Sequence, residues 1–154
     1  MGYVDQNLLP GETVIYRAKL HPIIFAPAIS FAVVGVFFLI VGFIDKAVSG
    51  FAILGVFFLA VGGLFGLARY IRLATSEFAI TDKRVLVKVG LVRRHTLELL
   101  LAKVETIGVD QGVFGRLFDY GTIIVTGTGG TKEPFKAIAN PLEFRKQVQS
   151  RAAG

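Results

Sequence analysis

The sequence predicts an α+β membrane protein, in which a transmembrane hairpin of two helices is joined to a β-barrel or β-sandwich with a C-terminal α-helix. Two observations predict the hairpin. Residues 23–44 and 48–68 contain no charged side chain, and 53% of the 154 residues are hydrophobic, with a mean hydropathy of +0.64. A third observation predicts the β domain, because apolar residues recur at every second position after residue 75. This composition is unusual for a soluble chain of such length.

Each apolar segment is long enough to cross a bilayer as a helix. The segments hold 22 and 21 residues. At about 1.5 Å per residue, either one spans a hydrocarbon core of roughly 30 Å. Only residues 45–47 separate them, so the chain must turn back at once and form a hairpin. The first segment begins at residue 23 and is longer than the apolar core of a signal peptide, so we expect it to be retained.

The two segments repeat each other. Residues 31–42 and 51–62 are identical at nine of twelve positions. A duplicated hydrophobic cassette with no further role would explain the repeat, but glycines at a seven-residue spacing also let membrane helices approach closely. These glycine faces would serve either the hairpin itself or contacts between copies of the protein. The helix-packing candidates are Gly35, Gly42, Gly55, Gly62 and Gly66.

Basic residues set the expected orientation. The hairpin turn carries one of them, Lys46, whereas Arg17, Lys19, Arg69 and Arg72 flank the segments and twelve more follow. By the positive-inside rule, both termini face the cytoplasm. The net charge of +6 then meets the anionic lipids of the cytoplasmic leaflet, which we expect as the partner in place of nucleic acid. Because cysteine is absent, disulfides and thiolate metal sites are excluded.

Strand-like alternation runs through the segment after the hairpin. Phe78 and Ile80 mark the first strand, residues 85–89 form the second after a turn at 81–83, and a third covers 93–101. Further strands are predicted over residues 104–109, 122–127 and 132–138. The result is a β meander.

A C-terminal helix completes the domain. Asn140 at the N-cap and Pro141 at the first helical position predict its start, and residues 142–150 form its body. Strands followed by one helix is the order of a PH-like barrel with its end plugged. The domain covers only 77 residues, 75–151, so its core needs a supplement. We therefore predict that a strand within residues 13–20, before the hairpin, joins the sheet.

These elements divide the chain into three parts. An N-terminal cytoplasmic segment covers residues 1–22, the transmembrane hairpin covers 23–70, and the cytoplasmic domain covers 75–151. Because a hairpin returns the chain to the same side of the membrane, the first and last parts meet there.

Seven short motifs follow one another along the chain. They are residues 8–12 (LLPGE), 21–22 (HP), 78–84 (FAITDKR), 104–107 (VETI), 114–117 (FGRL), 120–122 (YGT) and 138–141 (IANP). In this order the chain resembles the bacterial PH-like family of membrane-flanked domains (bPH2-type), once catalogued as a domain of unknown function. The resemblance implies a PH-fold barrel that faces the cytoplasm from the bacterial inner membrane, with no assigned reaction. Since some bacterial PH-like domains form ring-like homo-oligomers, it also implies assembly.

Neither histidine predicts catalysis. His21 lies beside the membrane and His95 on a strand, and neither pattern supplies a nucleophile with an orienting group or a second metal ligand. Residues 127–130 are glycine-rich but lack the Lys-Ser/Thr of a phosphate loop, so they predict a turn between strands. We therefore expect a protein that is not an enzyme and needs no cofactor or metal.

A basic hairpin is the first candidate binding surface. Lys88, Arg93 and Arg94 flank the turn at residues 90–92, near where eukaryotic PH domains bind phosphoinositides, although the spacing departs from theirs. Three interpretations stay open: selective headgroup recognition, generic contact with anionic lipid worth roughly 1 kcal/mol per basic residue, or a solvated hairpin. The residues expected to contact lipid or a partner are Arg69, Arg72, Lys88, Arg93 and Arg94.

A second candidate surface is the loop of residues 113–118. Its apolar side chains Phe114, Leu117 and Phe118 need cover, so we expect them to fold onto the barrel as a short helical turn. The alternative is contact with a neighbouring subunit or with the membrane surface. The membrane lies near because a linker at residues 69–76 reaches at most about 28 Å.

These patterns favour a non-enzymatic integral membrane protein that presents a cytoplasmic PH-like domain as a homo-oligomeric scaffold. Its interfaces would be the glycine faces, the sheet edges or the loop of residues 113–118. The alternative is an accessory subunit or adaptor that binds another membrane protein or anionic lipid headgroups through the basic hairpin. A transporter is disfavoured because the two apolar segments carry no ionisable residue.

Overall fold

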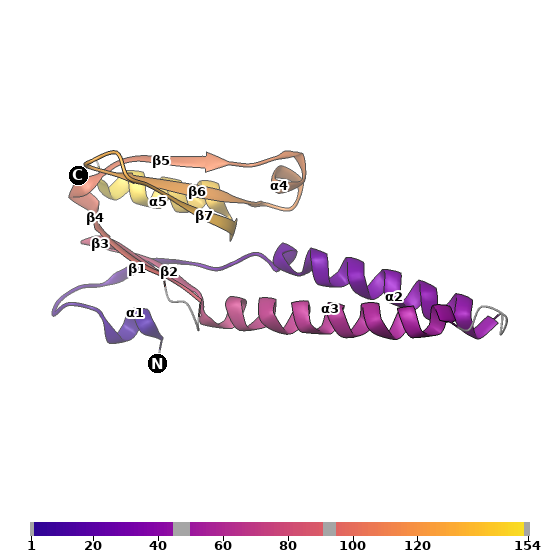
Figure 1. Cartoon of the computed structure of the whole chain (residues 1–154). Coiled ribbons are helices and arrows are strands. Elements are labelled where there is room, and N and C mark those ends of the chain that lie inside the picture. Colours follow the sequence, from indigo (N-terminus) through magenta and orange to yellow (C-terminus); the bar gives the residue numbers. More distant parts are fainter. Residues whose placement is uncertain (1, 45–49, 91–94, 153–154) are drawn as a thin grey trace. The chain divides into compact units, whose positions relative to one another are not determined.

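The computed structural model describes residues 2–44, 50–90 and 95–152 (Figure 1). The chain divides into two compact units. The helical unit is residues 22–72, and the β unit combines residues 1–21 with residues 73–154.

The helical unit begins with a 3₁₀ turn, η1 (Pro22–Phe25), followed by two long helices, α2 (Ala26–Ile44) and α3 (Gly50–Thr75). Both helical segments are long and apolar enough to cross a membrane. The expected turn at residues 45–47 lies outside the described residues. Pro22 opens the 3₁₀ turn, where its missing N–H breaks no helical hydrogen bond.

α3 continues beyond the end expected from the sequence. The apolar segment stops at residue 68, but residues 69–75 contain neither glycine nor proline, so nothing terminates the helix there. The expected linker of residues 69–76 is therefore wrong, and only Ser76 separates α3 from the next strand. Arg69 and Arg72 lie on the last turns of α3 instead.

The two helices pack through the predicted glycines. A Cβ atom added to Gly42 would lie 2.5 Å from the backbone nitrogen of Ala52, and one added to Gly55 would lie 2.7 Å from that of Leu39. No larger residue fits at these distances. The glycine faces therefore pack inside one hairpin. The buried glycines are Gly35, Gly42, Gly55 and Gly62, while Gly66 is half-buried.

Stacked phenylalanine rings line the same contact. Phe31 of α2 stacks on Phe58 and Phe65 of α3, with ring centroids 5.9 and 5.5 Å apart. Phe38 of α2 stacks on Phe51 and Phe58 at 5.6 and 5.8 Å. The 20-residue repeat explains the pattern, because exchanging the two copies turns the pair Phe31–Phe58 into the pair Phe51–Phe38. The repeat encodes a helix face that is complementary to itself.

Sheet A of the β unit has the strand order β1-β2-β3-β4, with neighbours antiparallel. β1, which precedes the helical unit in sequence, pairs with β2, which follows it. In this pair Ala18 lies opposite Phe78, and Val14 opposite Thr81. The helical unit is therefore inserted between two neighbouring strands of one sheet. The strands are β1 (Val14–Ala18), β2 (Glu77–Thr81), β3 (Arg84–Val89) and β4 (His95–Leu100).

Sheet B has the order β5-β6-β7, again antiparallel. A 3₁₀ turn, η3 (Leu101–Lys103), leads from β4 into β5, and the short helix α4 (Val113–Leu117) joins β5 to β6. The last helix is α5 (Pro141–Ala152), which starts at the proline that predicted it. The strands are β5 (Val104–Asp110), β6 (Tyr120–Gly127) and β7 (Lys132–Ala139).

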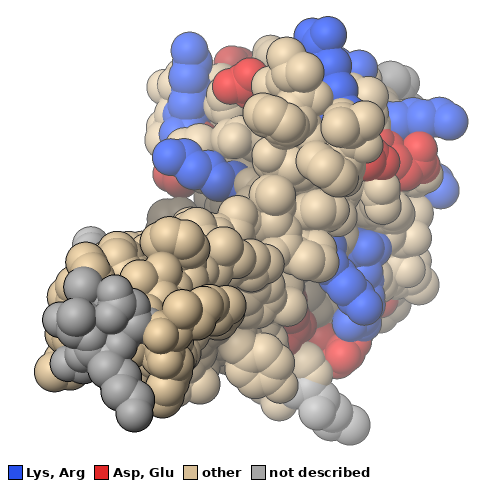
Figure 2. Space-filling model, turned by 90° about the vertical axis from the view of Figure 1, so that its right-hand side faces the viewer, with Lys and Arg blue, Asp and Glu red and all other residues tan. Residues whose placement is uncertain are grey.

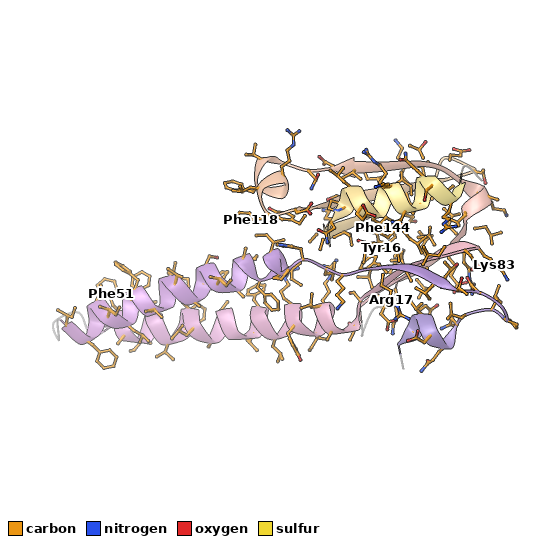
Figure 3. The ribbon with its side chains drawn as sticks, turned by 180° about the vertical axis from the view of Figure 1, so that it is seen from behind. Tyr16, Arg17, Phe51, Lys83, Phe118 and Phe144 are labelled. Atoms are coloured by element: carbon orange, nitrogen blue, oxygen red, sulfur yellow. The ribbon has the colours of Figure 1, made fainter. Side chains whose placement is uncertain are left out.

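The main core combines residues from both sheets and from α5. Phe144 and Val148 of α5 are fully buried, as are Ile80 of sheet A and Ile123 of sheet B. Figure 3 labels Tyr16 of β1 beside Phe144, and their rings meet edge to face at 6.3 Å.

The two sheets do not close into the expected barrel. Because η3 turns the chain, β4 and β5 end up in different sheets. The sheets meet at another corner, where Leu20 bridges to Ile138 and the backbone N–H of His21 donates to the carbonyl of Ala137 at 2.7 Å. The fold is thus α+β with two antiparallel sheets, which agrees with a PH-like fold without a closed barrel.

The N-terminal segment covers the opposite face of sheet A with a short helix, α1 (Tyr3–Gln6). Val4 is buried against Ala79 and Leu86. The backbone N–H groups of Val4 and of the residue before it donate to the carboxylate of Glu77 at 3.0 and 2.7 Å. The sequence did not predict α1, because four residues show no periodicity and the acceptor is distant in sequence.

Candidate functional site

The motif of residues 8–12 forms a tight turn that aims its last side chain into the β unit. The backbone N–H of Glu12 donates to the carbonyl of Leu9 at 2.9 Å, and the N–H of Leu9 donates to Oε2 of Glu12 at 2.7 Å. Gly11 has a φ of 75°, which glycine adopts at this turn position without strain. The Glu12 side chain is left 0% exposed.

Glu12 forms a buried ion pair with Arg84. Its Oε1 accepts hydrogen bonds from Nε of Arg84 at 2.9 Å and from the hydroxyl of Thr81 at 2.7 Å. Its Oε2 accepts a hydrogen bond from Nη2 of Arg84 at 3.0 Å. The hydrogen bonds from Arg84 hold the pKa of Glu12 at about 2, below its usual 4.5, although burial alone would raise it. Arg84 also donates to Glu98 at 2.6 Å and to the carbonyl of Asn7 at 2.5 Å.

This ion pair joins the two parts of the β unit. Glu12 precedes the helical unit in sequence and Arg84 follows it. Among the described residues, no buried side-chain nitrogen or oxygen lacks a hydrogen-bond partner. A carboxylate with its hydrogen bonds already satisfied is suited to holding the fold together and not to reacting with a substrate.

Of the five predicted basic residues, the structure describes Lys88, Arg69 and Arg72. The ammonium of Lys88 lies 5.1 Å from the ring centroid of Tyr3, so it is engaged within the β unit. Arg93 and Arg94 lie outside the described residues. Arg69 is half-buried and Arg72 exposed, both on α3 of the helical unit. On the face shown in Figure 2, Lys and Arg side chains form separate groups with Asp and Glu beside them.

The apolar residues at α4 are exposed, so the expectation that they fold onto the barrel is wrong. Val113 is 83% exposed, Phe114 68%, Leu117 72% and Phe118 52%. The expected helical turn is present, but it directs these side chains outward. Figure 3 labels Phe118 beside α4, at the end of the β unit that carries this short helix.

Hydrogen bonds and close packing hold the backbone of α4 in place. The amide Nε2 of Gln111 donates to the carbonyl oxygens of Gly115 and Tyr120 at 3.3 and 3.1 Å. A Cβ atom on Gly115 would lie 2.6 Å from the carbonyl oxygen of Tyr120, so the loop closes only around glycine. The backbone N–H of Asn140 donates to the carbonyl of Asp119 at 3.0 Å, which ties the loop to the start of α5.

Among the described residues, surface cavities adjoin sheet B at two places. One of about 390 Å³ lies beside α4 and is lined by Asp110, Phe114, Tyr120 and Lys136 among others. A second of about 320 Å³ lies between β4 and the β6–β7 turn. Leu97, Leu99, Val125 and Glu133 contribute to its lining. In the described ranges, no three His, Cys, Asp or Glu side chains come together as a metal site.

Both histidines have neighbours of a structural kind. The ring of His21 stacks on Tyr120, with centroids 5.2 Å apart. Nε2 of His95 lies 3.2 Å from the carboxylate of Glu133, a contact that connects β4 of sheet A with β7 of sheet B.

The geometry defines a class of protein: an α+β domain of two antiparallel sheets and a C-terminal helix, with two apolar helices inserted after its first strand. The chain belongs to the bacterial PH domain family, whose sequence model matches residues 25–152. The match begins in the first apolar segment, so both long helices belong to the family pattern. Comparison with curated proteins and with solved structures gave no match.

The residues that carried the resemblance in the sequence build the fold. Glu12 and Arg84, from two distant motifs, form the ion pair. Gly121, like Gly115, is required by packing, because a Cβ atom there would lie 2.7 Å from the side chain of Gln111. The roles of Gln111 and Glu77 were not predicted from the sequence, because no local pattern marks either residue. Both act on backbone groups that only the folded chain brings to them.

Proposed function

We propose that the chain is a non-enzymatic integral protein of the bacterial inner membrane that presents its β unit to the cytoplasm as a binding scaffold. The observation that carries the proposal is the insertion of two apolar helices between β1 and β2, which pair directly in sheet A. The β unit is attached to the helices through both strands. A PH domain attached in this way is kept at the membrane permanently, so recruitment is not its task.

The surface of the helices supports a spanning arrangement. Only 11% of the most apolar window of each helical segment is buried inside the structure, unlike the core helix of a soluble protein. Soluble proteins rarely expose continuous apolar surface on this scale. A bilayer removes it from water, and both segments exceed the roughly 20 residues that crossing requires.

The topology can be tested with single cysteines, because the chain has none of its own. A Cβ atom at Gly50, the first residue of α3, meets nothing within 4 Å, and Gln149 is exposed on α5. In cells with a permeabilised outer membrane, a membrane-impermeant maleimide should label the Gly50→Cys variant but not the Gln149→Cys variant. After cell disruption it should label both. Labelling of the Gln149→Cys variant in intact cells would refute the proposed orientation.

The neighbours of both histidines support binding over catalysis. His21 is stacked on Tyr120, and His95 faces Glu133 across the two sheets. The most buried carboxylate, that of Glu12, is already paired with Arg84. The pair with Arg84 leaves the Glu12 carboxylate unavailable for proton transfer.

The scaffold part of the proposal needs contact between copies. The glycine faces are used inside the hairpin, whereas β4 ends sheet A as an edge strand. Edge strands present backbone groups that pair readily with another chain, and this supports assembly through β4.

Native mass spectrometry of the full-length protein, released in mild detergent, tests the assembly. A defined multiple of 16.7 kDa is the expected result. A monomer that carries lipid or a foreign protein would favour the adaptor role through the basic hairpin instead. In that case the Lys88→Glu variant should lose the companion, and Lys146→Glu, at an exposed position of α5, should retain it.

A further inference from the structure

We infer that α4 and Phe118 form a membrane-surface anchor, whose apolar side chains enter the boundary between lipid headgroups and acyl chains. The inference rests on the proposed membrane insertion and adds a second, interfacial contact for the β unit. The partner that this anchor contacts is the lipid bilayer.

The first support is the concentration of exposed apolar side chains. Four large apolar residues within residues 113–118 are more than half exposed. Elsewhere in the described part of the β unit, exposed large apolar residues stand singly, as do Leu9, Leu100 and Leu142. Single exposed residues are normal on a soluble surface, but a cluster marks a contact.

The second support is that the cluster is rigidly presented. Gln111 binds two carbonyl groups of the loop, and Gly115 permits the close approach of Tyr120. These specific contacts keep α4 in an outward orientation. A loop that merely lacked a place in the core would need no such support.

The third support is the position of α4 within the β unit. Tyr120 follows the loop directly, and its ring stacks on His21. His21 is the residue before Pro22, where the helical unit begins. The α4 end of the β unit is therefore the end at which the chain leaves for the apolar helices. Tyrosine side chains are enriched at the membrane–water boundary.

The chemistry of α4 also fits a lipid interface. Arg116 is the charged residue of α4, and it is exposed. Its long side chain can keep the guanidinium at the phosphates while neighbouring apolar groups lie deeper. A second copy of the chain fits less well, because a stable protein interface needs roughly 800 Å² from each partner and four side chains on a short turn supply much less.

A single-tryptophan experiment tests the inference, since the chain contains no tryptophan. The full-length Phe114→Trp variant is placed in vesicles of phosphatidylethanolamine and phosphatidylglycerol, with or without brominated acyl chains. The control is Leu100→Trp, at another exposed apolar position. Leu100 precedes η3 and β5, and the seven residues of β5, about 23 Å of strand, separate η3 from the loop that carries α4.

The expected result is a blue-shifted emission from the Phe114→Trp variant, which loses most of its intensity with the brominated lipid, while the control changes little. Leu117→Trp is a second reporter, should Phe114→Trp fail to fold. Unshifted, unquenched emission from both reporters would refute the inference. So would a blue shift without quenching that disappears on dilution of protein in lipid, because it would indicate a second copy.

Carbonate extraction separates this inference from the proposed function. If the variants stay in the carbonate-washed vesicles while both reporters are unquenched, the helices span and only the anchor is refuted. If the protein is released by carbonate, the membrane insertion itself fails.

Discussion

Replacing Glu12 by glutamine should destabilise the β unit by about 3 kcal/mol at neutral pH. The substitution keeps the size of the side chain but removes the charge that Arg84 binds. The pKa of Glu12 is lowered from 4.5 to about 2, mainly by the hydrogen bonds from Arg84. At about 1.4 kcal/mol per pKa unit, this corresponds to about 3 kcal/mol in favour of the charged form. Loss of one partner from a buried ion pair costs a similar amount, about 3–5 kcal/mol.

The pH dependence gives the reasoning a second, independent check. A carboxylate whose pKa is lower in the folded state stabilises the fold above its unfolded pKa and loses that contribution as the pH falls. The difference between wild type and the Glu12→Gln variant should therefore be complete above pH 4.5, shrink below it, and vanish near pH 2.

Urea unfolding of the full-length protein in a mild non-ionic detergent measures this difference. The apolar helices stay folded in the micelle, since their backbone groups are bonded internally. Tyrosine fluorescence then reports mainly on the β unit, which holds Tyr3, Tyr16 and Tyr120 of the four tyrosines. The control is Glu105→Gln, at an exposed position of β5. Equal midpoints for the two variants at pH 7, or a difference that is constant down to pH 3, would refute the reasoning.

Two further substitutions test close approaches in each unit. Gly42→Leu should force α2 and α3 apart, because even its Cβ atom would lie 2.5 Å from the backbone nitrogen of Ala52. We expect a lower melting temperature of the helices in detergent. Gly63→Leu is the control and should leave this temperature unchanged, because a Cβ atom at Gly63 meets nothing within 4 Å. Gly115→Ala should destabilise the β unit by about 1–3 kcal/mol through overpacking, measured by the same urea titration, and the reasoning fails if Gly112→Ala, with open space at its Cβ, has an equal effect.

Most of the secondary structure was predictable because its signals are local. The apolar segments, the period-two strands and the Asn140-Pro141 start of α5 are patterns of neighbouring residues, and the structure has an element at each. The N-terminal strand was expected from the size of the domain, because 77 residues need additional core. The structure confirms this strand, since β1 pairs with β2. By contrast, α1 was missed because Glu77 of β2 holds its first N–H groups.

The candidate site was less predictable, because an apolar residue has different meanings in water and beside a membrane. Phe114, Leu117 and Phe118 were expected to be covered by the barrel, whereas the structure exposes them. The contacts of the basic hairpin were left open by the sequence, and the structure holds Lys88 against Tyr3 of the N-terminal segment. The contact of Lys88 depends on a residue far away along the chain, which no local pattern reveals.

The sequence by itself determined the two apolar helices, the order of the strands and the terminal helix, because hydrophobic periodicity and capping act between near neighbours. It also determined that the two helices carry the same repeated face of glycines. Only the tertiary structure decided that this face is used within the hairpin and that the strands form two sheets without a closed barrel. It also decided that Glu12 pairs with Arg84, although the inserted helices separate the two residues in the sequence. These outcomes depend on contacts between residues separated by tens of positions, and such contacts leave no local periodicity to read.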